Sequence, residues 1–217
     1  MIPLEAKGLH RFYRREDSEV AALLDVSLIC AQGETVAVTG PSGSGKSTLL
    51  GLLCGLDDPD GGSVSVSGQR ISHQSPASAA RIRARHIGVL TQSSGLLGHL
   101  TVLQNVRFAA SLRGGAGPSP DELVESLGLS AVRGSAPRTL SGGETARAGL
   151  AVALAGSPTV LLADEPTAEV SSHEEDAILD LLGEWRPRYG ATVIVTHSAA
   201  VARRADRIVH LIDGRVA

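Results

Sequence analysis

The glycine-rich stretch at residues 40–48, GPSGSGKST, constrains this chain more than any other part of its sequence. It fits the pattern G-x-x-x-x-G-K-[S/T], follows an apolar run at 34–40 and precedes a helical pattern at 46–56. When a strand leads into such a loop and a helix follows it, the backbone N–H groups of the loop and of the helix N-terminus point to one place. These N–H groups can bind phosphate. The sequence therefore predicts an α/β fold with a phosphate-binding loop. The residues expected to form it are Gly40, Pro41, Ser42, Gly43, Ser44, Gly45, Lys46, Ser47 and Thr48.

Two side chains of this stretch have specific expected roles. Lys46, one of only two lysines in the chain, would reach the β- and γ-phosphates of a bound nucleotide. Ser47 would offer its hydroxyl to Mg²⁺. The competing interpretation is a glycine-rich turn with a chance lysine, which is disfavoured because the motif agrees with the strand and helix patterns beside it.

A pair of acids ends the apolar run at 159–164, TVLLAD. Its β-branched and apolar residues are typical of a buried parallel strand. Open α/β sheets bind ligands at the carboxyl ends of such strands, so Asp164 is expected to hold Mg²⁺ directly or through water. Glu165, the next residue, would polarise an attacking water molecule. The alternative, a strand that simply ends in solvated acids, is minor beside a phosphate loop.

The organisation of the chain favours one α/β domain with a largely parallel sheet, because short apolar runs alternate with helical patterns. Residues 63–68 alternate like a half-exposed antiparallel strand, and Cys30 and Cys54 are interpreted as reduced core residues. The net charge of −3 gives no electrostatic basis for binding nucleic acid. No uncharged apolar run reaches the ~20 residues that span a bilayer. We therefore expect a cytoplasmic chain that meets a membrane only through a partner.

The segment LSGGE at residues 140–144 separates this chain from most proteins with a phosphate loop. Ser141 can cap a helix together with Glu144, as in a capping box. Gly142 and Gly143 leave bare N–H groups at the N-terminus of that helix, which attracts anions. An ordinary glycine-containing helix cap is the alternative interpretation.

In sequence order, an aromatic residue, the phosphate loop, Gln92, LSGGE, Asp-Glu and His197 together resemble the ATP-binding subunits of ABC transporters, over essentially the whole chain. This resemblance implies a P-loop NTPase fold with a RecA-like, mostly parallel sheet core, an N-terminal antiparallel β subdomain and an inserted helical subdomain. The core and β subdomain would cover about 1–92 and 156–217, and the helical subdomain about 93–155. ATP and Mg²⁺ are the implied ligands, and ATP hydrolysis is the implied reaction.

The resemblance also assigns roles to single residues. In the family, the residue matching Gln92 contacts Mg²⁺ and the attacking water, and the one matching His197 contacts the γ-phosphate. Tyr13 aligns with an N-terminal aromatic residue that stacks on adenine, and its neighbour Phe12 competes for that role. The family directs the LSGGE end at the γ-phosphate bound by the opposite subunit, here through Ser141, Gly142, Gly143 and Glu144.

Further details resemble one subgroup, the lipoprotein-releasing and macrolide-exporting ATPases, with the cell-division ATPase of the same type also close. The stretches at 40–64 and 90–106 carry this likeness. It implies a second ATP-binding subunit and a transmembrane permease on a separate polypeptide, with this chain peripheral on the inner face of the cell membrane. A regulatory scaffold of the cell-division type is an alternative, as is the impaired half of a heterodimer.

Four positions depart from the family pattern: Thr145, Ala146, Ser171 and Ser198. Glutamines are usual at the first two, and aspartates at the last two. We hypothesise that ATP binding is intact and that hydrolysis is slow or needs a non-identical partner; neutral drift is the competing explanation. Ser171 is still expected to form a capping box with Glu174. The helix that follows is expected to bury Ala177, Ile178, Leu181, Leu182 and Trp185.

Overall fold

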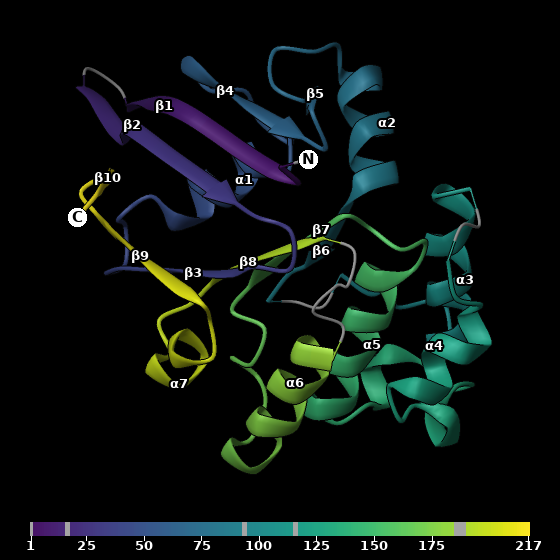
Figure 1. Ribbon diagram of the computed structural model, residues 1–217. Coiled ribbons are helices and arrows are strands. Elements are labelled where there is room, and N and C mark those ends of the chain that lie inside the picture. Colours follow the sequence, from purple (N-terminus) through teal and green to yellow (C-terminus); the bar gives the residue numbers. More distant parts are fainter. Residues whose placement is uncertain (1, 16–17, 93–94, 115–116, 185–189) are drawn as a thin grey trace.

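The computed structural model describes residues 2–15, 18–92, 95–114, 117–184 and 190–217. In this part of the chain, two sheets and a group of helices form three layers (Figure 1). The strands are β1 (Leu4–Arg15), β2 (Ser18–Cys30), β3 (Thr35–Thr39), β4 (Gly61–Val66), β5 (Gln69–Arg70), β6 (Ile87–Leu90), β7 (Val160–Asp164), β8 (Ala191–Val195), β9 (Arg207–Ile212) and β10 (Arg215–Val216). The helices are α1 (Lys46–Leu53), α2 (Pro76–His86), α3 (Val102–Leu112), α4 (Pro120–Ser126), α5 (Gly142–Leu154), α6 (Ser172–Glu184) and α7 (Ala199–Arg203), with 3₁₀ turns at Ser130–Val132 and Pro137–Thr139.

The larger sheet has the strand order β10-β9-β3-β8-β7-β6, and all of its pairs except β10 with β9 are parallel. The smaller sheet, β2-β1-β4-β5, is antiparallel. This arrangement confirms the predicted fold class. The half-exposed strand expected at 63–68 is also present, as β4, which buries Val64 and Val66 on one face.

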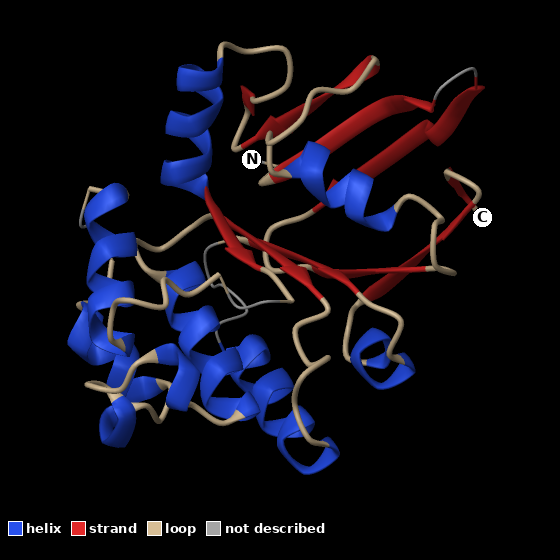
Figure 2. Cartoon of the chain, turned by 180° about the vertical axis from the view of Figure 1, so that it is seen from behind, coloured by secondary structure: helices blue, strands red, loops and turns tan. Residues whose placement is uncertain are grey.

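The alternation of side chains along the parallel strands explains the layers. In β7, Val160 and Leu162 point into a cluster that also contains α1 and the antiparallel sheet. Leu161 and Ala163 point into a second cluster with α3, α4, α5 and α6. Because successive residues of a strand face opposite sides, a continuous apolar run is what a sheet covered on both faces requires. Figure 2 shows α1 between the two sheets and the larger group of helices on the other side of the parallel sheet.

A cation joins the helices to this sheet. The guanidinium of Arg113, directly after α3, donates to the carbonyls of Ala153 at 2.6 Å and Ile87 at 3.2 Å, and also to the carbonyl of Ala155. Two of these carbonyls lie at the C-terminal end of α5, which carries partial negative charge. Burial lowers the pKa of Arg113 to about 10, so the side chain still carries its charge at neutral pH. Arg113 therefore ties α3, α5 and β6 together.

The buried face of α6 differs in part from the expectation. The buried stripe is Ile178, Leu179 and Leu182, and Leu181 packs partly buried against the same cluster, whereas Ala177 is exposed. At the start of the helix, the hydroxyl of Ser171 donates to Glu174 Oε2 at 3.0 Å.

Some expectations fall on residues that are not described. Trp185 lies outside the described residues, as do the first two residues of the helical segment expected at 93–155. Cys30 and Cys54 are both buried and unpaired, as predicted. No helix formed by the described residues has both the length and the apolar character that a membrane span requires.

Candidate functional site

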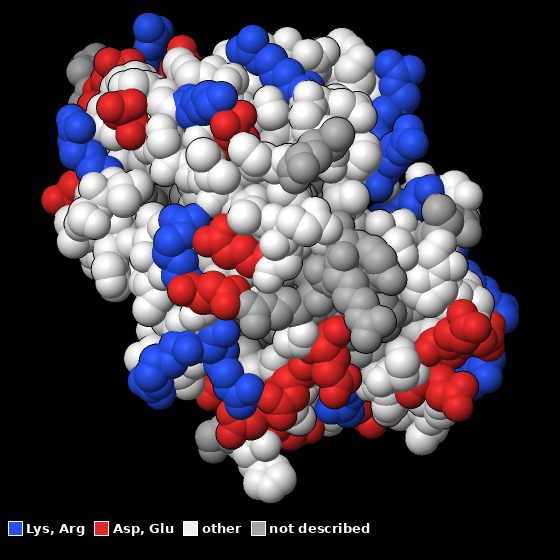
Figure 3. Space-filling view, viewed as in Figure 1, with Lys and Arg blue, Asp and Glu red and all other residues white. Residues whose placement is uncertain are grey.

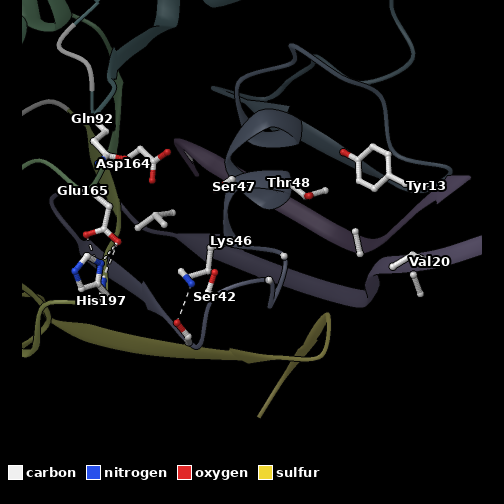
Figure 4. Close-up of a pocket in the computed structure, with 16 residues that line it drawn as sticks. Tyr13, Val20, Ser42, Lys46, Ser47, Thr48, Gln92, Asp164, Glu165 and His197 are labelled. Atoms are coloured by element: carbon white, nitrogen blue, oxygen red, sulfur yellow. Dashed lines mark hydrogen bonds and ion pairs between the residues drawn. The ribbon is translucent and has the colours of Figure 1, made fainter. Parts of the chain in front are cut away.

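The candidate site is a cleft of about 490 Å³ at the edge of the parallel sheet where β3, β6, β7 and β8 all end (Figure 4). The register aligns these ends, because Val38 and Asp164 both pair with Val195, and Leu90 pairs with Ala163. Four strand ends therefore deliver four different loops to one place. The residues at or just after these strand ends that line the cleft are Gly40, Ser42, Gly43, Gly45, Lys46, Ser47, Thr48, Gln92, Asp164, Glu165 and His197.

The glycine loop after β3 has a conformation that side chains would block. Gly40 and Gly45 have φ of 151° and 101°. A Cβ on Gly40 would lie 2.0 Å from the carbonyl oxygen of Leu211, and one on Gly45 would lie 2.3 Å from that of Ala22. Glycine is therefore required at both positions for the loop to pass so close to neighbouring backbone.

Polar groups are concentrated inside this loop. Helix α1 begins at Lys46 with no side-chain cap on its first N–H groups, so its N-terminus is open to an anion. Lys46 Nζ donates to the carbonyls of Gly40 and Pro41, both at 2.8 Å, which holds the ammonium across the mouth of the loop. The buried hydroxyl of Ser44 has no hydrogen-bond partner among the described residues. This set of donors fits phosphate oxygens.

The acid at the end of β7 is suited to a cation. Asp164 is half-buried beside the loop, and burial raises its pKa. The neighbouring Glu165 raises that pKa further, whereas Lys46 lowers it. A divalent cation would offset the burial of this carboxylate, and Ser47 and Gln92 line the same cleft as oxygen donors of the kind that Mg²⁺ binds.

Glu165 has a specific and strained placement. Its φ is 46°, which is uncommon for a residue with a side chain, and its backbone N–H donates to the carbonyl of Val195 at 2.9 Å. Its carboxylate accepts from Thr196 Oγ1 at 3.0 Å, from the His197 N–H at 3.0 Å and from His197 Nδ1 at 2.7 Å. Since a carboxylate only accepts, Nδ1 of His197 carries the proton and Nε2 remains available to another group.

An aromatic side chain lines the cleft at its far end. Tyr13 lies there, opposite Val20 on the neighbouring strand, and the guanidinium of Arg11 covers its ring with 4.9 Å between the charge centre and the ring centroid. Arg11 is held in turn by Asp57 at 2.7 Å. Phe12 does not line the cleft, since its ring stacks with His10 at a centroid distance of 6.4 Å. The geometry therefore favours Tyr13 over Phe12 as a platform for a base.

The LSGGE residues do not reach this cleft. Ser141 and Glu144 form the predicted capping box, with the Ser141 N–H donating to the Glu144 carboxylate at 2.8 Å and the Glu144 N–H donating to Ser141 Oγ at 3.2 Å. Ser141 and Gly142 are exposed and Gly143 is buried. Gly142 instead lines a separate small cavity together with Gln92 and Glu165, so this helix end lies beside the phosphate cleft without forming part of its wall.

Two groups of residues at the site were not predicted. Val20, Ala21 and Ala22 of β2 form one wall of the cleft. No local pattern marks them, because they reach the cleft only through the pairing of β2 with β1. Thr196 bonds Glu165, and its position directly before the predicted site residue His197 was the available signal.

The fold and the site together define a P-loop nucleoside triphosphatase. The family model described as "ABC transporter" matches residues 23–168, and the chain belongs to this family.

Several known proteins are similar over most of the chain. The ABC transporter ATP-binding protein YbbA of Escherichia coli K12 is 40% identical over 98% of this chain and 96% of its own length. The lipoprotein-releasing system ATP-binding protein LolD of Bacteroides fragilis is 38% identical over 89% of this chain and 92% of its own length. The macrolide export ATP-binding/permease protein MacB of Salmonella typhi is 39% identical over 98% of this chain, which spans only 34% of that longer protein.

A solved structure shows the same likeness in three dimensions. The dimeric, post-hydrolysis state of the ATP-binding cassette MJ0796 bound to ADP and Pi has a TM-score of 0.90 and is 33% identical. The match covers 98% of this chain and 96% of that one.

Replacing Tyr13 by alanine is expected to weaken the binding of ATP by about 5- to 150-fold, since stacking of a base on an aromatic ring contributes about 1–3 kcal/mol. Titration with a fluorescent ATP analogue measures the change, and Phe12→Ala is the matched control that should leave the affinity within about twofold. An equal loss in both variants, or a loss in Phe12→Ala alone, would remove Tyr13 from this role.

Proposed function

We propose that this chain binds ATP with Mg²⁺ and hydrolyses it to drive a membrane transporter whose permease is a separate polypeptide. One observation carries the proposal: the phosphate loop, Gln92, Asp164, Glu165 and His197 all line one cleft. The similarity to transporter ATP-binding proteins such as LolD supports the same conclusion.

In this proposal, different residues bind the phosphates and the metal. Lys46 exchanges its two carbonyl partners for phosphate oxygens, and the N-terminus of α1 adds backbone N–H donors. Ser47, Gln92 and Asp164 hold Mg²⁺, which neutralises charge on the phosphates when it is bound.

Glu165 and His197 carry the proposed chemistry. Glu165 accepts the proton of the attacking water, and its bonds to Thr196 and His197 orient the carboxylate for that step. Nε2 of His197 lies on the other side of the ring from the bond to Glu165, and it contacts the γ-phosphate as a donor when it also carries a proton. The exposed side of this pair faces the cleft rather than the core (Figure 4).

Replacing Glu165 by glutamine is expected to lower kcat at least about 100-fold, because a general base contributes about 10²–10⁴ in rate. ATP should still bind, so the variant should accumulate as an ATP-bound dimer in size-exclusion chromatography. Glu169→Gln, an exposed carboxylate four residues on, is the control. Hydrolysis at the wild-type rate by Glu165→Gln would exclude Glu165 as the base.

A second ATP-binding subunit is part of the proposal. The helix end at Ser141 and Gly142 is exposed and is not part of the wall of its own chain's cleft, so a nucleotide held by a second subunit can reach it. The dimeric state of the related cassette MJ0796 supports this arrangement.

Two of the unusual residues, Ser171 and Ser198, bear on how the second subunit would be met. Ser171 bonds only within its own chain, through Glu174, and Ser198 caps α7 through the N–H of Val201 at 3.4 Å. Neither side chain offers the charge that the family places at a subunit boundary. We propose that a homodimer of this chain hydrolyses ATP slowly. Slow hydrolysis is also compatible with two alternative roles, a nucleotide-dependent scaffold and one half of a heterodimer.

Replacing Ser171 by aspartate is expected to raise ATP turnover by about tenfold in the chain assembled with its permease, because the restored charge favours a productive dimer. Ser130→Asp, an exposed serine at a distant turn, controls for added charge. Ordinary transporter turnover by the wild type, together with no effect of Ser171→Asp, would support neutral drift instead.

A groove between α2 and α3 is the proposed docking site for the permease, and this contact would hold the chain on the inner face of the membrane. The groove encloses about 460 Å³ and includes Leu97, Phe108 and Leu112. Phe108 is 47% exposed and Leu112 is 62% exposed, although only 2% of the residues in this chain are aromatic. An exposed apolar groove of this kind suits a short apolar helix that projects from the permease.

Phe108→Ala combined with Leu112→Ala is expected to weaken co-purification with the permease partner by at least about tenfold, without loss of ATP binding. Leu56→Ala provides the control, since Leu56 is 68% exposed and lies outside the groove. Unchanged co-purification by the double variant would place the permease elsewhere.

A further inference from the structure

We propose that Glu175, in the first turn of α6, is a positioning residue that holds the two catalytic loops in register. The inference rests on the proposed role of Glu165 as the base. Glu175 itself is not among the residues that line the cleft.

The carboxylate of Glu175 joins two loops that come from different strands. Its Oε1 accepts from Thr167 Oγ1 at 3.1 Å and from Ser198 Oγ at 3.3 Å. Thr167 lies two residues after Glu165, in the loop that follows β7, and is buried. Ser198 directly follows His197, in the loop that follows β8. One oxygen atom therefore holds both loops.

The contacts continue from Ser198 to the base. The Ser198 N–H donates to Thr196 Oγ1 at 3.0 Å, and Thr196 Oγ1 donates to Glu165 Oε2 at 3.0 Å. Thr196 is 1% exposed, so water does not compete for these bonds. Together with the backbone from 165 to 167, the bonds close a ring that contains Glu165 and has Glu175 as its anchor on α6.

The anchor fits the local electrostatics. Acidic side chains gather over α6, as Figure 3 shows at the lower edge of this face, and an acid in the first turn of a helix is stabilised by the helix N-terminus. Asp176 and Asp180 of this helix pair with Arg204 at 2.9 Å and 2.6 Å. Among the described residues, no lysine or arginine forms an ion pair with Glu175. Its carboxylate is therefore held by the two loop hydroxyls.

The side chain of the neighbouring acid, Glu174, contacts a different part of the molecule. A Cβ placed on Gly143 would lie 2.2 Å from Glu174 Oε1, so Glu174 packs against the N-terminal turn of α5. Glu174 also accepts from Ser171. The two consecutive acids of α6 therefore serve different neighbours, and only Glu175 contacts the loops of Glu165 and His197.

Glu165 depends on such support because its backbone is held in the left-handed region with φ of 46°. Without the anchor, the loop from 165 to 167 loses the bond that fixes Thr167, and the loop at 196–198 loses the bond that fixes Ser198. A small displacement of a catalytic group lowers the rate far more than it lowers substrate affinity. The phosphate loop, which holds the nucleotide, makes no contact with Glu175 among the described hydrogen bonds.

The test compares Glu175→Ala and Glu175→Gln in the full chain assembled with its permease. Glu175→Ala is expected to lower kcat about tenfold with the KM for ATP unchanged within about twofold. Glu175→Gln keeps one oxygen that both hydroxyls can donate to, so it should retain at least about half of the wild-type kcat. Asp176→Ala, an exposed acid of the same turn, is the matched control and should change neither constant.

Ser198→Ala tests the connection itself. It should lower kcat less than Glu175→Ala does, and the double variant should be no slower than Glu175→Ala, since both changes break the same ring. Unchanged kcat in Glu175→Ala would overturn the proposal. Equal losses in Glu175→Ala and Glu175→Gln, accompanied by a lower melting temperature, would also overturn it and assign Glu175 a structural role.

Hydrogen exchange separates this proposal from the proposed function. The backbone N–H of His197, which donates to Glu165, should exchange at least about fivefold faster in Glu175→Ala than in the wild type or in Asp176→Ala. This readout does not need hydrolysis. A wild type without ATPase activity would contradict the proposed function, and unaltered exchange at His197 would contradict the role of Glu175.

Discussion

Parallel pairing of β3, β7 and β8 is the constraint on which the rest of the structure depends. Because the three strands run the same way and in register, their carboxyl ends meet at one edge. The loop after β3 supplies the glycines and N–H donors that fit phosphate oxygens, β7 ends at Asp164 and is followed by Glu165, and the loop after β8 supplies His197. The chemistry of the site is distributed over segments far apart in sequence, and the hydrogen bonds of the sheet bring them together.

The features that the sequence predicted are those in which a local pattern carries the chemistry. The phosphate loop was predictable because glycines, a lysine and a hydroxyl stand at fixed spacing between a strand and a helix, and the structure shows why Gly40 cannot carry a side chain. Asp164 was predictable because the apolar run of a buried strand ends where the first acidic residue appears. The subdomain boundaries near 92 and 155, and the roles of Gln92, His197 and Tyr13, stay predictions.

The features that the sequence did not predict depend on contacts between distant segments. Val20 reaches the cleft only through its pairing with Tyr13, and the ring around Glu165 needs α6 to lie against two loops at once. The expected face of α6 was wrong at Ala177, since helical periodicity gives the width of an apolar stripe more reliably than its direction. The capping box expected at Ser171 stays a prediction, and the structure shows a bond within the same pair, from the Ser171 hydroxyl to the Glu174 carboxylate.

The division of β7 between two apolar clusters has a consequence for folding cooperativity. Val160 and Leu162 belong to one cluster, and Leu161 and Ala163 belong to the other, so a single strand forms the wall between them. Detaching the helices would expose one side of that wall to water, and β7 would then lose half of its packing. The stability of the helical layer and that of the sheet are thus thermodynamically linked. We therefore expect conformational changes to move the helical layer and the sheet as rigid bodies, without local unfolding of either.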